Sequence, residues 1–274
     1  MSANMLQDKV VVITGSTRGI GRAIADACGA AGARVVVCAR REPDVDATIR
    51  ELAAADVPVC GMVADVSVTE DLESLRDLAL SWYGHIDCWV NNAGISLGYR
   101  PLDEIEPAAL RSIVDVNLTG TILGCRAILP HFREHGGVLL NMSGRGYRGD
   151  ATPYTAAYAA TKAAVASLTL SIARENRGVP VSIDALVPGM VDTDFYVDIE
   201  SSPRLAATAG NWRYALDAFG VPLDEVGART VPVLAQAPGA KTGRIHNLIG
   251  GPRTARGVAK MIWLRATGKM SAEE

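Results

Sequence analysis

A tyrosine and a lysine four residues apart, Tyr158 and Lys162, are the side chains of this sequence best suited to moving a proton. On a helix, residues at this spacing lie on one face, so the phenol and the ammonium group can point into the same cleft. A free tyrosine, with a pKa of about 10, is a poor base at neutral pH. A neighbouring lysine cation stabilises the phenolate and lowers the tyrosine pKa, which favours general acid–base catalysis. The spacing also occurs by chance on many helices, so its context has to decide.

A glycine-rich turn near the N-terminus supplies that context, in the stretch Thr14–Gly21 that reads T-G-S-T-R-G-I-G. It follows an apolar run of strand length and precedes an alanine-rich stretch of helical character, as in dinucleotide-binding units. Glycines at this spacing (Gly15, Gly19, Gly21) permit a tight turn and close approach of the backbone to a pyrophosphate. The free N–H groups and the dipole of the following helix favour the anion there. The alternative is an ordinary turn between a strand and a helix.

The elements that must position these groups alternate along nearly the whole chain. The expected strands are Val10–Thr14, Arg34–Ala39, Val59–Ala64, Ile86–Val90, Val138–Met142, Val181–Val187 and Arg244–Ile249. The expected helices lie near Ile20–Ala31, Asp44–Ala55, Thr69–Trp82, Leu102–Phe132 and Tyr154–Asn176. Several strands are apolar without alternation, as strands covered on both faces are. The order predicts an α/β fold, a Rossmann-type doubly wound parallel sheet of about seven strands.

Domain organisation follows from the same pattern. We expect a single domain over residues 1–274, with a core at about 8–251 and a short basic tail at 252–274 that has no assigned role. The stretch Thr193–Pro222 holds no clear strand, and we expect it to cross a binding cleft. It carries the aromatic residues Phe195, Tyr196, Trp212, Tyr214 and Phe219.

Composition excludes several classes of protein. The 274 residues are 49% hydrophobic, enough for a substantial core, and the net charge of −3 argues against a nucleic-acid binder. No apolar run reaches the roughly 18 residues that a membrane span needs. The five cysteines lack the spacing of a metal site or disulfide frame and are expected to be buried in a reducing compartment. We therefore expect a cytoplasmic protein without a metal, a nucleic-acid partner or a membrane.

Taken together, these motifs resemble those of the short-chain dehydrogenase/reductase family. The glycine turn has that family's T-G-x-x-x-G-x-G spacing, Asn91–Gly94 matches its N-N-A-G, and Tyr158 with Lys162 matches its Y-x-x-x-K. The resemblance extends from about Lys9 to Gly251, nearly the whole chain. It implies an oxidoreductase that moves a hydride between a nicotinamide and a carbonyl or secondary alcohol carbon, with Tyr158 as general acid and base assisted by Lys162.

The choice of nicotinamide cofactor should be decided at the end of the second strand. A carboxylate there would bind the ribose hydroxyls and repel a 2′-phosphate. This sequence has Ala39 where the NAD-preferring members carry Asp, and Arg40 follows at once. Arg18 in the glycine turn can reach the same phosphate, and paired guanidiniums bind phosphate well. Both arginines are also compatible with solvated surface positions. We expect NADP, with NAD as the less favoured choice.

Further residues are assigned to the cofactor by resemblance. Asp65 and Val66 close the third strand, where family members hold the adenine, and Thr193 in the P-G-x-x-x-T match would bind the nicotinamide carboxamide. The full expected cofactor set is Gly15, Thr17, Arg18, Gly19, Ile20, Gly21, Arg40, Arg41, Asp65, Val66, Asn92, Ala93, Gly94, Tyr158, Lys162, Pro188, Gly189, Val191 and Thr193.

Two further catalytic positions are assigned in the same way, and one of them departs from the family. Asn117 matches the asparagine that holds a water linking the lysine to solvent. Family members end the fifth strand in Ser-Ser, and the second serine hydrogen-bonds the substrate oxygen. Here the strand ends in Ser143-Gly144, and the interval to the tyrosine is one residue longer. We expect Ser143 to turn into the site; a backbone N–H near Gly144 or the Arg145 side chain are the alternatives.

Substrate and partners are less defined. Three segments should surround the substrate, and they supply Tyr99, Arg100, Arg145, Tyr147, Arg148, Phe195, Tyr196 and Trp212. This mixture is compatible with a bulky or aromatic carbonyl or alcohol, and equally with residues that only seal the cleft. By resemblance, the helix Tyr154–Asn176 pairs across subunits of a homodimer or homotetramer. The competing functions are a nicotinamide-binding sensor or scaffold, suggested by Gly144, and a nicotinamide-dependent isomerase or dehydratase.

Overall fold

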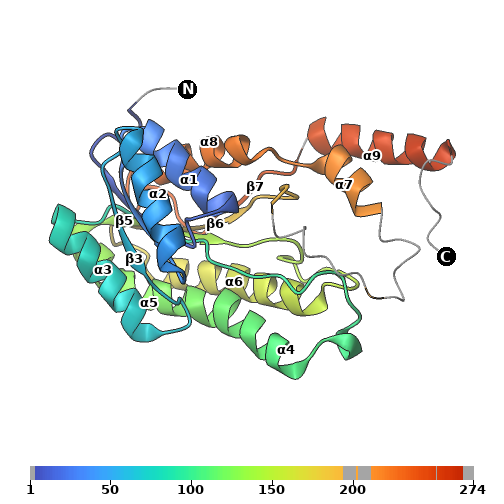
Figure 1. The fold of residues 1–274 in the computed structure, drawn as a ribbon, viewed down its shortest axis with the longest axis horizontal. Helices are drawn as coiled ribbons and strands as arrows, with labels where there is room; N and C mark the ends of the chain where they lie inside the picture. Colours follow the sequence, from blue (N-terminus) through green and yellow to red (C-terminus); the bar gives the residue numbers. More distant parts are fainter. Residues whose placement is uncertain (1–3, 194–201, 203–210, 251, 268–274) are drawn as a thin grey trace.

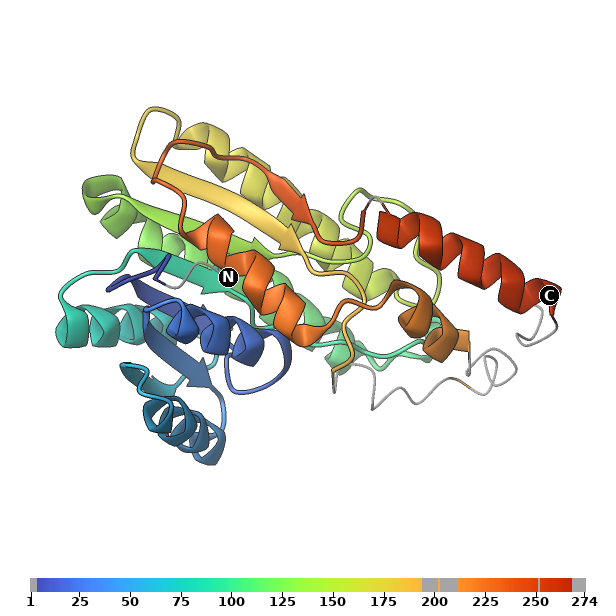
Figure 2. The ribbon, with the colours of Figure 1, turned by 90° about the horizontal axis from the view of Figure 1, so that it is seen from above.

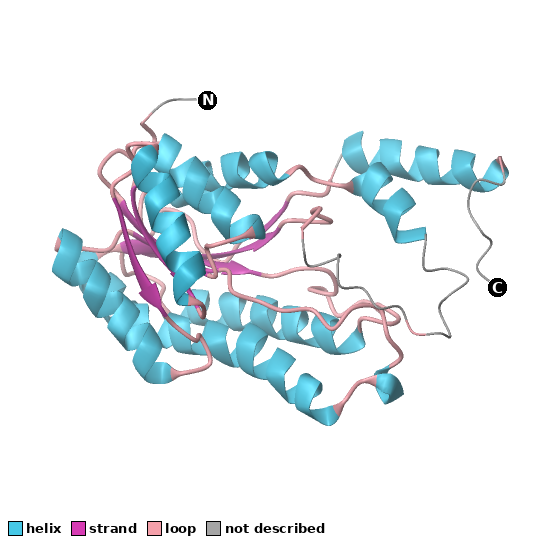
Figure 3. Ribbon diagram, viewed as in Figure 1, coloured by secondary structure: helices cyan, strands magenta, loops and turns pink. Residues whose placement is uncertain are grey.

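A parallel sheet forms the centre of the molecule, between two layers of helices (Figure 1 and Figure 3). The computed structural model describes residues 4–193, 202, 211–250 and 252–267. Seven strands follow one another in the order β3-β2-β1-β4-β5-β6-β7, and every neighbouring pair is parallel. The chain order reverses between β1 and β4, which creates the crevice where doubly wound sheets bind ligands. The predicted Rossmann-type fold is confirmed.

The bounds of the elements are as follows. The strands are β1 (Val10–Thr14), β2 (Arg34–Ala39), β3 (Val59–Val63), β4 (Cys88–Asn91), β5 (Gly137–Met142), β6 (Val181–Val187) and β7 (Ile245–Asn247). The α-helices are α1 (Gly19–Ala30), α2 (Glu42–Ala54), α3 (Thr69–Tyr83), α4 (Pro107–Val114), α5 (Gly120–His135), α6 (Ala156–Glu175), α7 (Asn211–Phe219), α8 (Leu223–Leu234) and α9 (Pro252–Ala266). A 3₁₀ turn, η1 (Leu102–Glu104), precedes α4, and a π-helical segment, η2 (Asp115–Thr119), joins α4 to α5.

Both faces of the sheet are buried, which explains the unbroken apolar strands. In β1, Val11 and Ile13 belong to the core under α1, α2 and α8, whereas Val10 and Val12 belong to the core over α3, α5 and α6. Successive side chains of a strand point to opposite faces, so a strand covered on both sides must be apolar at every position. All five cysteines are free and buried, as expected.

The expected helix Leu102–Phe132 is wrong as one continuous element. The backbone is extended at Glu106, and α4 starts afresh at Pro107, whose ring fixes a helical φ but provides no N–H for a preceding turn. The π-helical turn of η2 then interrupts the α-helical hydrogen-bond pattern before α5 continues to His135. Apolar spacing alone did not reveal either interruption, because both halves keep a buried apolar face, α4 against α6 and α5 against β4 and β5.

The C-terminal third contains three helices that the sequence pattern did not predict. Helix α8 packs on α1, where Gly227 lies so close to the Ala23 carbonyl that a side chain would overlap it. Helix α7 lies within the expected cleft-crossing stretch, and α9 occupies the tail expected to be without a role; these two pack together beyond the edge of the sheet (Figure 2). Phe195 and Tyr196 lie outside the described residues, as does the side chain of Trp212.

Two helical stretches are long and apolar enough to cross a membrane by length and composition alone, Pro107–His135 and Ala156–Glu175. The expectation that no stretch reaches this length therefore fails under a criterion that tolerates two charged residues. About half of each apolar window is buried inside the protein, 56% and 44%, and core helices of a packed sheet meet the same criterion. The two helices are weak evidence for a membrane span.

Candidate active site

A pocket of about 1120 Å³ lies at the carboxyl ends of the strands, over the reversal between β1 and β4. Every residue expected to bind the cofactor contributes to its wall, and so do Tyr158, Lys162 and Ser143. Asn117 is the exception among the expected site residues, since it is fully buried behind the wall. The fold therefore brings together segments that are spread over 180 residues of sequence, from the glycine turn to the stretch after β6.

The glycine turn is shaped so that side chains cannot replace its hydrogens. Gly15 has a φ of +62°, and a Cβ there would lie 2.9 Å from the Ala93 Cα. A Cβ at Gly21 would overlap the Gly15 carbonyl oxygen. Helix α1 begins at Gly19 at the pocket wall, and the first N–H groups of a helix have no partner within the helix. This backbone cradle at a helix N-terminus fits a dinucleotide pyrophosphate.

Asn92 holds the turn in place from the neighbouring strand. Its side-chain amide donates to the carbonyl oxygens of Thr14 at 2.9 Å and Gly15 at 3.0 Å. Its backbone N–H and that of Ala93 both donate to the Thr14 hydroxyl. The N-N-A-G motif therefore fixes the phosphate turn through the end of β4, in addition to lining the pocket.

The first asparagine of the motif has a different role. The Asn91 amide donates to the Asn141 side-chain oxygen at 2.9 Å and accepts from the Trp89 indole at 2.7 Å. Asn141 in turn donates to the Thr169 hydroxyl at 3.0 Å. These buried polar groups satisfy one another, as buried polar groups must. They tie β4, β5 and α6 together beneath the pocket.

Three arginines and two carboxylates line the end of the pocket next to β2: Arg18, Arg40, Arg41, Asp44 and Asp65. The side chains of Arg18, Arg40 and Arg41 are exposed, and Arg41 lies 3.7 Å from Asp44. Burial alone would raise the pKa of Asp65. Hydrogen bonds from the side chain and backbone of Ser67, together with the Arg40 charge, outweigh it and hold that pKa below its usual value. Asp65 is therefore a charged group with its own partners.

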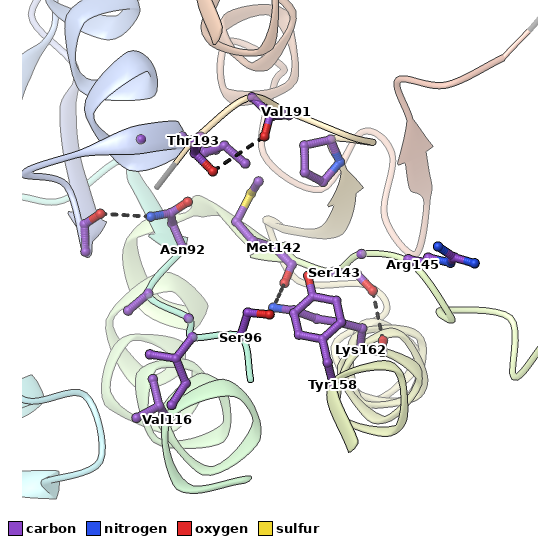
Figure 4. A pocket seen from close by; sticks show the side chains of 18 of the residues that line it. Asn92, Ser96, Val116, Met142, Ser143, Arg145, Tyr158, Lys162, Val191 and Thr193 are labelled. Atoms are coloured by element: carbon purple, nitrogen blue, oxygen red, sulfur yellow. Dashed lines mark hydrogen bonds between the residues drawn. The ribbon is translucent and has the colours of Figure 1, made fainter. Parts of the chain in front are cut away.

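Tyr158 and Lys162 face the pocket from α6, one turn apart (Figure 4). The Lys162 amine lies 5.6 Å from the centre of the Tyr158 ring and donates to the Met142 carbonyl oxygen at 2.9 Å. Lys162 is only 5% exposed, and its burial lowers its pKa from 10.5 to about 8. Burial disfavours the charged form of an amine, so this lysine can lose its proton near physiological pH. The predicted pairing of the two side chains in one cleft is present.

Ser143 contributes to the pocket wall, but its hydroxyl is bonded to the protein and is not turned toward a substrate as expected. Its hydroxyl is buried and donates to the Lys162 carbonyl oxygen at 2.8 Å, which ties the end of β5 to α6 (Figure 4). At the next position, a Cβ on Gly144 would lie 2.6 Å from the Tyr158 hydroxyl. The tyrosine oxygen thus occupies the space that a side chain at position 144 would need. The longer interval to Tyr158 did not rotate Ser143 inward, because the β5 pairing with β6 continues to its N–H.

Asn117 lies in the π-helical segment η2 and fixes the chain after N-N-A-G. Its side-chain oxygen accepts from the Ile95 N–H at 2.8 Å, and its amide nitrogen donates to the Ile95 carbonyl at 3.0 Å. The same nitrogen lies 3.4 Å from the Thr161 hydroxyl on α6. Both backbone groups of Ile95 are thereby held by one side chain.

The stretch after β6 completes the far wall. Thr193 contributes its side chain beside the glycine turn, since a Cβ on Gly19 would lie 3.5 Å from the Thr193 methyl group. Several wall residues were not predicted from the sequence: Ser96, Met142, Met190, Asn247, Ile249 and Thr254. Ser96 follows N-N-A-G by two residues and could have been found from that spacing. Thr254 comes from α9, and no motif marks it. Phe219 of α7 lies in the wall, as expected for the stretch predicted to cross the cleft.

Other chemistries find no support at this site. No group of three or more His, Cys, Asp or Glu side chains among the described residues could hold a metal ion. Burial raises the pKa of every cysteine thiol, so none is an activated nucleophile.

The fold and the phosphate cradle define a Rossmann-type dinucleotide-binding protein, and comparison with known proteins specifies the family. The chain matches the family model described as short chain dehydrogenase over residues 9–203. It therefore belongs to the short-chain dehydrogenase family and is an oxidoreductase of that family.

Individual relatives differ in what they act on. A probable chlorophyll(ide) b reductase of Arabidopsis thaliana is 38% identical over 67% of this chain, and the match spans 41% of that protein's own length. A solved variant of actinorhodin polyketide ketoreductase with NADPH is 31% identical, with a TM-score of 0.77 over 89% of this chain and 97% of that one. A 3-ketoacyl-(acyl-carrier-protein) reductase from Brucella melitensis complexed with NADH is 28% identical, with a TM-score of 0.79 and coverages of 90% and 99%.

Proposed function

We propose that this protein is an NADP(H)-dependent oxidoreductase that interconverts a carbonyl compound and a secondary alcohol. The observation that carries the proposal is the Tyr158 hydroxyl, which faces the pocket over Gly144 with the buried Lys162 amine on the same side. A proton donor at this point can serve a substrate oxygen, because Tyr158 and Gly144 both line the pocket and no side chain at position 144 covers the tyrosine oxygen.

The residues of the cradle fit a nicotinamide dinucleotide. The turn around Gly15 and Gly19 would hold the pyrophosphate, and the Thr193 side chain lies beside this turn. Asp65 and Val66 lie at the adenine end by resemblance to the family. When bound in its reduced form, such a cofactor supplies a hydride to the carbonyl carbon.

The side chains of this chain then handle the proton. In the reducing direction the Tyr158 hydroxyl donates its proton to the carbonyl oxygen, and in the oxidising direction the phenolate accepts it from the alcohol. The Lys162 cation stabilises the phenolate. Two hydrogen bonds hold the lysine in position: its amine donates to the Met142 carbonyl, and its own carbonyl accepts from the Ser143 hydroxyl. By resemblance, Asn117 belongs to the path that returns a proton from solvent.

The preference for NADP rests on charge at the end of β2. Ala39 offers no carboxylate to the ribose hydroxyls, and the exposed Arg40 and Arg18 line the same part of the pocket. Two guanidiniums can bind a 2′-phosphate through charge-assisted hydrogen bonds. Arg41 is partly engaged by Asp44, which leaves Arg40 as the principal phosphate ligand in this proposal.

We further propose that the protein acts in the cytoplasm as a homodimer or homotetramer. Small side chains, among them Ala156, Ala160 and Ser167, are exposed on α6 beside the half-exposed Leu170. A second helix can approach such a surface closely. Light scattering of the purified protein measures the assembly, and a monomer at micromolar concentration would contradict it.

The decisive experiment follows NADPH oxidation with a panel of ketones and aldehydes, for the natural protein and for Tyr158→Phe. We expect turnover with at least one carbonyl, and loss of turnover by about 10²- to 10⁴-fold in the variant, the range general acid–base catalysis contributes. NADPH affinity, measured by fluorescence titration, should change little. Full activity of Tyr158→Phe would refute the mechanism.

One second candidate function has an observation in its favour. Gly144 removes the usual hydroxyl and Ser143 is engaged elsewhere, as in a cofactor-binding sensor or scaffold with impaired turnover. The same assay separates the two. A sensor would bind NADPH tightly, but none of the carbonyl compounds in the panel would lead to NADPH oxidation.

A further inference from the structure

The site lacks a hydroxyl at the position where the family places one for the substrate oxygen. Position 144 is glycine, and the space of its side chain belongs to the Tyr158 oxygen. The adjacent Ser143 is buried and uses its proton to bind the Lys162 carbonyl. A carbonyl oxygen at Tyr158 would therefore gain no second hydroxyl donor from the end of β5.

The segment after N-N-A-G offers a hydroxyl donor on the pocket wall. Ser96 lines the pocket two residues after N-N-A-G, and Figure 4 shows its hydroxyl directed toward the Lys162 amine and the Tyr158 ring. Its neighbourhood agrees, because a Cβ on Gly94 would lie 3.7 Å from the Lys162 amine. The segment that carries Ser96 therefore borders the part of the pocket next to the Lys162 amine.

The hydroxyl of Ser96 has its proton available. Its oxygen accepts a hydrogen bond from the Gly98 N–H at 3.2 Å, which fixes the oxygen and leaves the O–H to donate. Across the part of the chain that the structure describes, that O–H donates to no other protein group. A donor oriented on a pocket wall without a protein acceptor is suited to a ligand oxygen.

Asn117 gives this donor a rigid support. Both backbone groups of Ile95 are bound by the one buried amide, at 2.8 and 3.0 Å, and the residue that follows is Ser96. A donor stabilises a developing negative charge best when it is held in place before the reaction. The asparagine is thus a positioning residue for Ser96 in addition to its family role.

We propose that Ser96 is a catalytic residue, which donates a hydrogen bond to the substrate oxygen beside Tyr158 and replaces the hydroxyl missing at Gly144. The inference rests on the proposed function, since it presupposes a carbonyl or alkoxide oxygen at Tyr158. Arg145 is the side-chain competitor for this role, but it is exposed and Figure 4 shows it directed away from the tyrosine.

The test compares hydroxyl deletions in the NADPH oxidation assay. Ser96→Ala should lower kcat by about 10²-fold, as expected for loss of one oriented donor. Ser96→Thr retains the hydroxyl and should keep most of the activity. Ser112→Ala, which makes the same change at an exposed position on α4 outside the pocket, should leave kcat and the affinity for NADPH unchanged.

A loosened loop is separated from a lost donor by a second substitution. Ser96→Cys preserves size but is a weak donor, so its kcat should fall as in Ser96→Ala while the melting temperature and NADPH affinity stay near those of the natural protein.

If Ser96→Ala and Ser96→Cys keep the full kcat while Tyr158→Phe is inactive, the role of Ser96 is refuted and the proposed function is unaffected. If kcat falls strongly in Arg145→Ala and not in the Ser96 variants, Arg145 is the donor to the substrate oxygen. If the natural protein fails to oxidise NADPH with every carbonyl compound tested, the proposed function is refuted, and this inference is refuted with it.

Discussion

The two halves of the pocket are built on different principles. In the cofactor half, the turn around Gly15 and Gly21 is held by backbone contacts and by the Asn92 amide, and almost any side chain added there would collide. In the substrate half, loops after β4 and β5 and the ends of α7 and α9 contribute individual side chains. A shared cofactor requires one backbone geometry, whereas a substrate requires only suitable groups nearby. The first half is therefore recognisable from sequence, and the second can exchange one donor for another.

The largest expected effect tests the rigidity of the cofactor half. Gly21→Ala places a methyl group onto the Gly15 carbonyl and the Asn92 amide, so the turn must shift. We expect NADPH affinity to fall by more than about 10²-fold, with about 3 kcal/mol lost from the free energy of unfolding, as for severe overpacking. Fluorescence titration and urea denaturation measure the two. Gly250→Ala, at a position with open space, is the matched control.

The same substitution in the substrate half should separate binding from chemistry. Gly144→Ala brings a methyl group to 2.6 Å from the Tyr158 hydroxyl, which must move aside. A displacement of the catalytic group by about 1 Å can cost about 10²-fold in rate. Steady-state kinetics should show this fall in kcat while the Kd for NADPH stays within about twofold. Equal losses in both quantities would mean that the halves are not independent.

The pH dependence of the reduction sharpens the comparison further. Burial lowers the Lys162 pKa to about 8, so its positive charge is present below that pH and is lost as the pH rises through it. We expect kcat/KM for carbonyl reduction to fall above about pH 8, approaching tenfold per pH unit. NADPH affinity measured over the same range serves as the control. A flat profile up to pH 9.5, roughly 1.5 units beyond the lysine pKa, would contradict a role for the charged lysine.

The smallest effect concerns the arginine side chains of the cofactor half. Arg40→Ala should weaken NADPH binding by about tenfold, the worth of one charge-assisted hydrogen bond, and should leave NADH affinity nearly unchanged. Competition titrations with the two cofactors give the ratio. Arg50→Ala removes an equally exposed arginine outside the pocket and controls for net charge. Parallel losses for both cofactors would remove the basis for an NADP preference.

What the sequence could predict follows the same division. The strands and the glycine turn were predictable because strands covered on both faces must be apolar at every position and because the turn has no room for side chains at Gly15 and Gly21. The sequence pattern did not predict helix α8, although Val226, Val231 and Leu234 are buried on it and the helix packs against α1. Boundaries shifted for local reasons: α6 starts at Ala156 because Tyr154 has a positive φ, and β7 extends over only three residues.

The misplaced site residue was Ser143, and its case shows what motif spacing omits. A longer loop after β5 suggested that the hydroxyl could rotate inward, but strand pairing fixes its N–H on Leu186 and its side chain on the Lys162 carbonyl. Ser96 lies two residues after N-N-A-G, but no motif assigns it a role. Its significance depends on the Asn117 amide across the fold, a contact between residues 22 positions apart that no local pattern encodes.

The π-helical segment between α4 and α5 has a consequence for how this protein can change. Such a turn holds one residue more than an α-helical path between the same ends. The extra residue therefore rotates the apolar face of α5 relative to that of α4, so the two helices can face different neighbours. Deleting one residue within Asp115–Thr119 would restore a plain helix and rotate the Asn117 amide by about 100°. A deletion of one codon would therefore change the orientation of the loop that Asn117 holds.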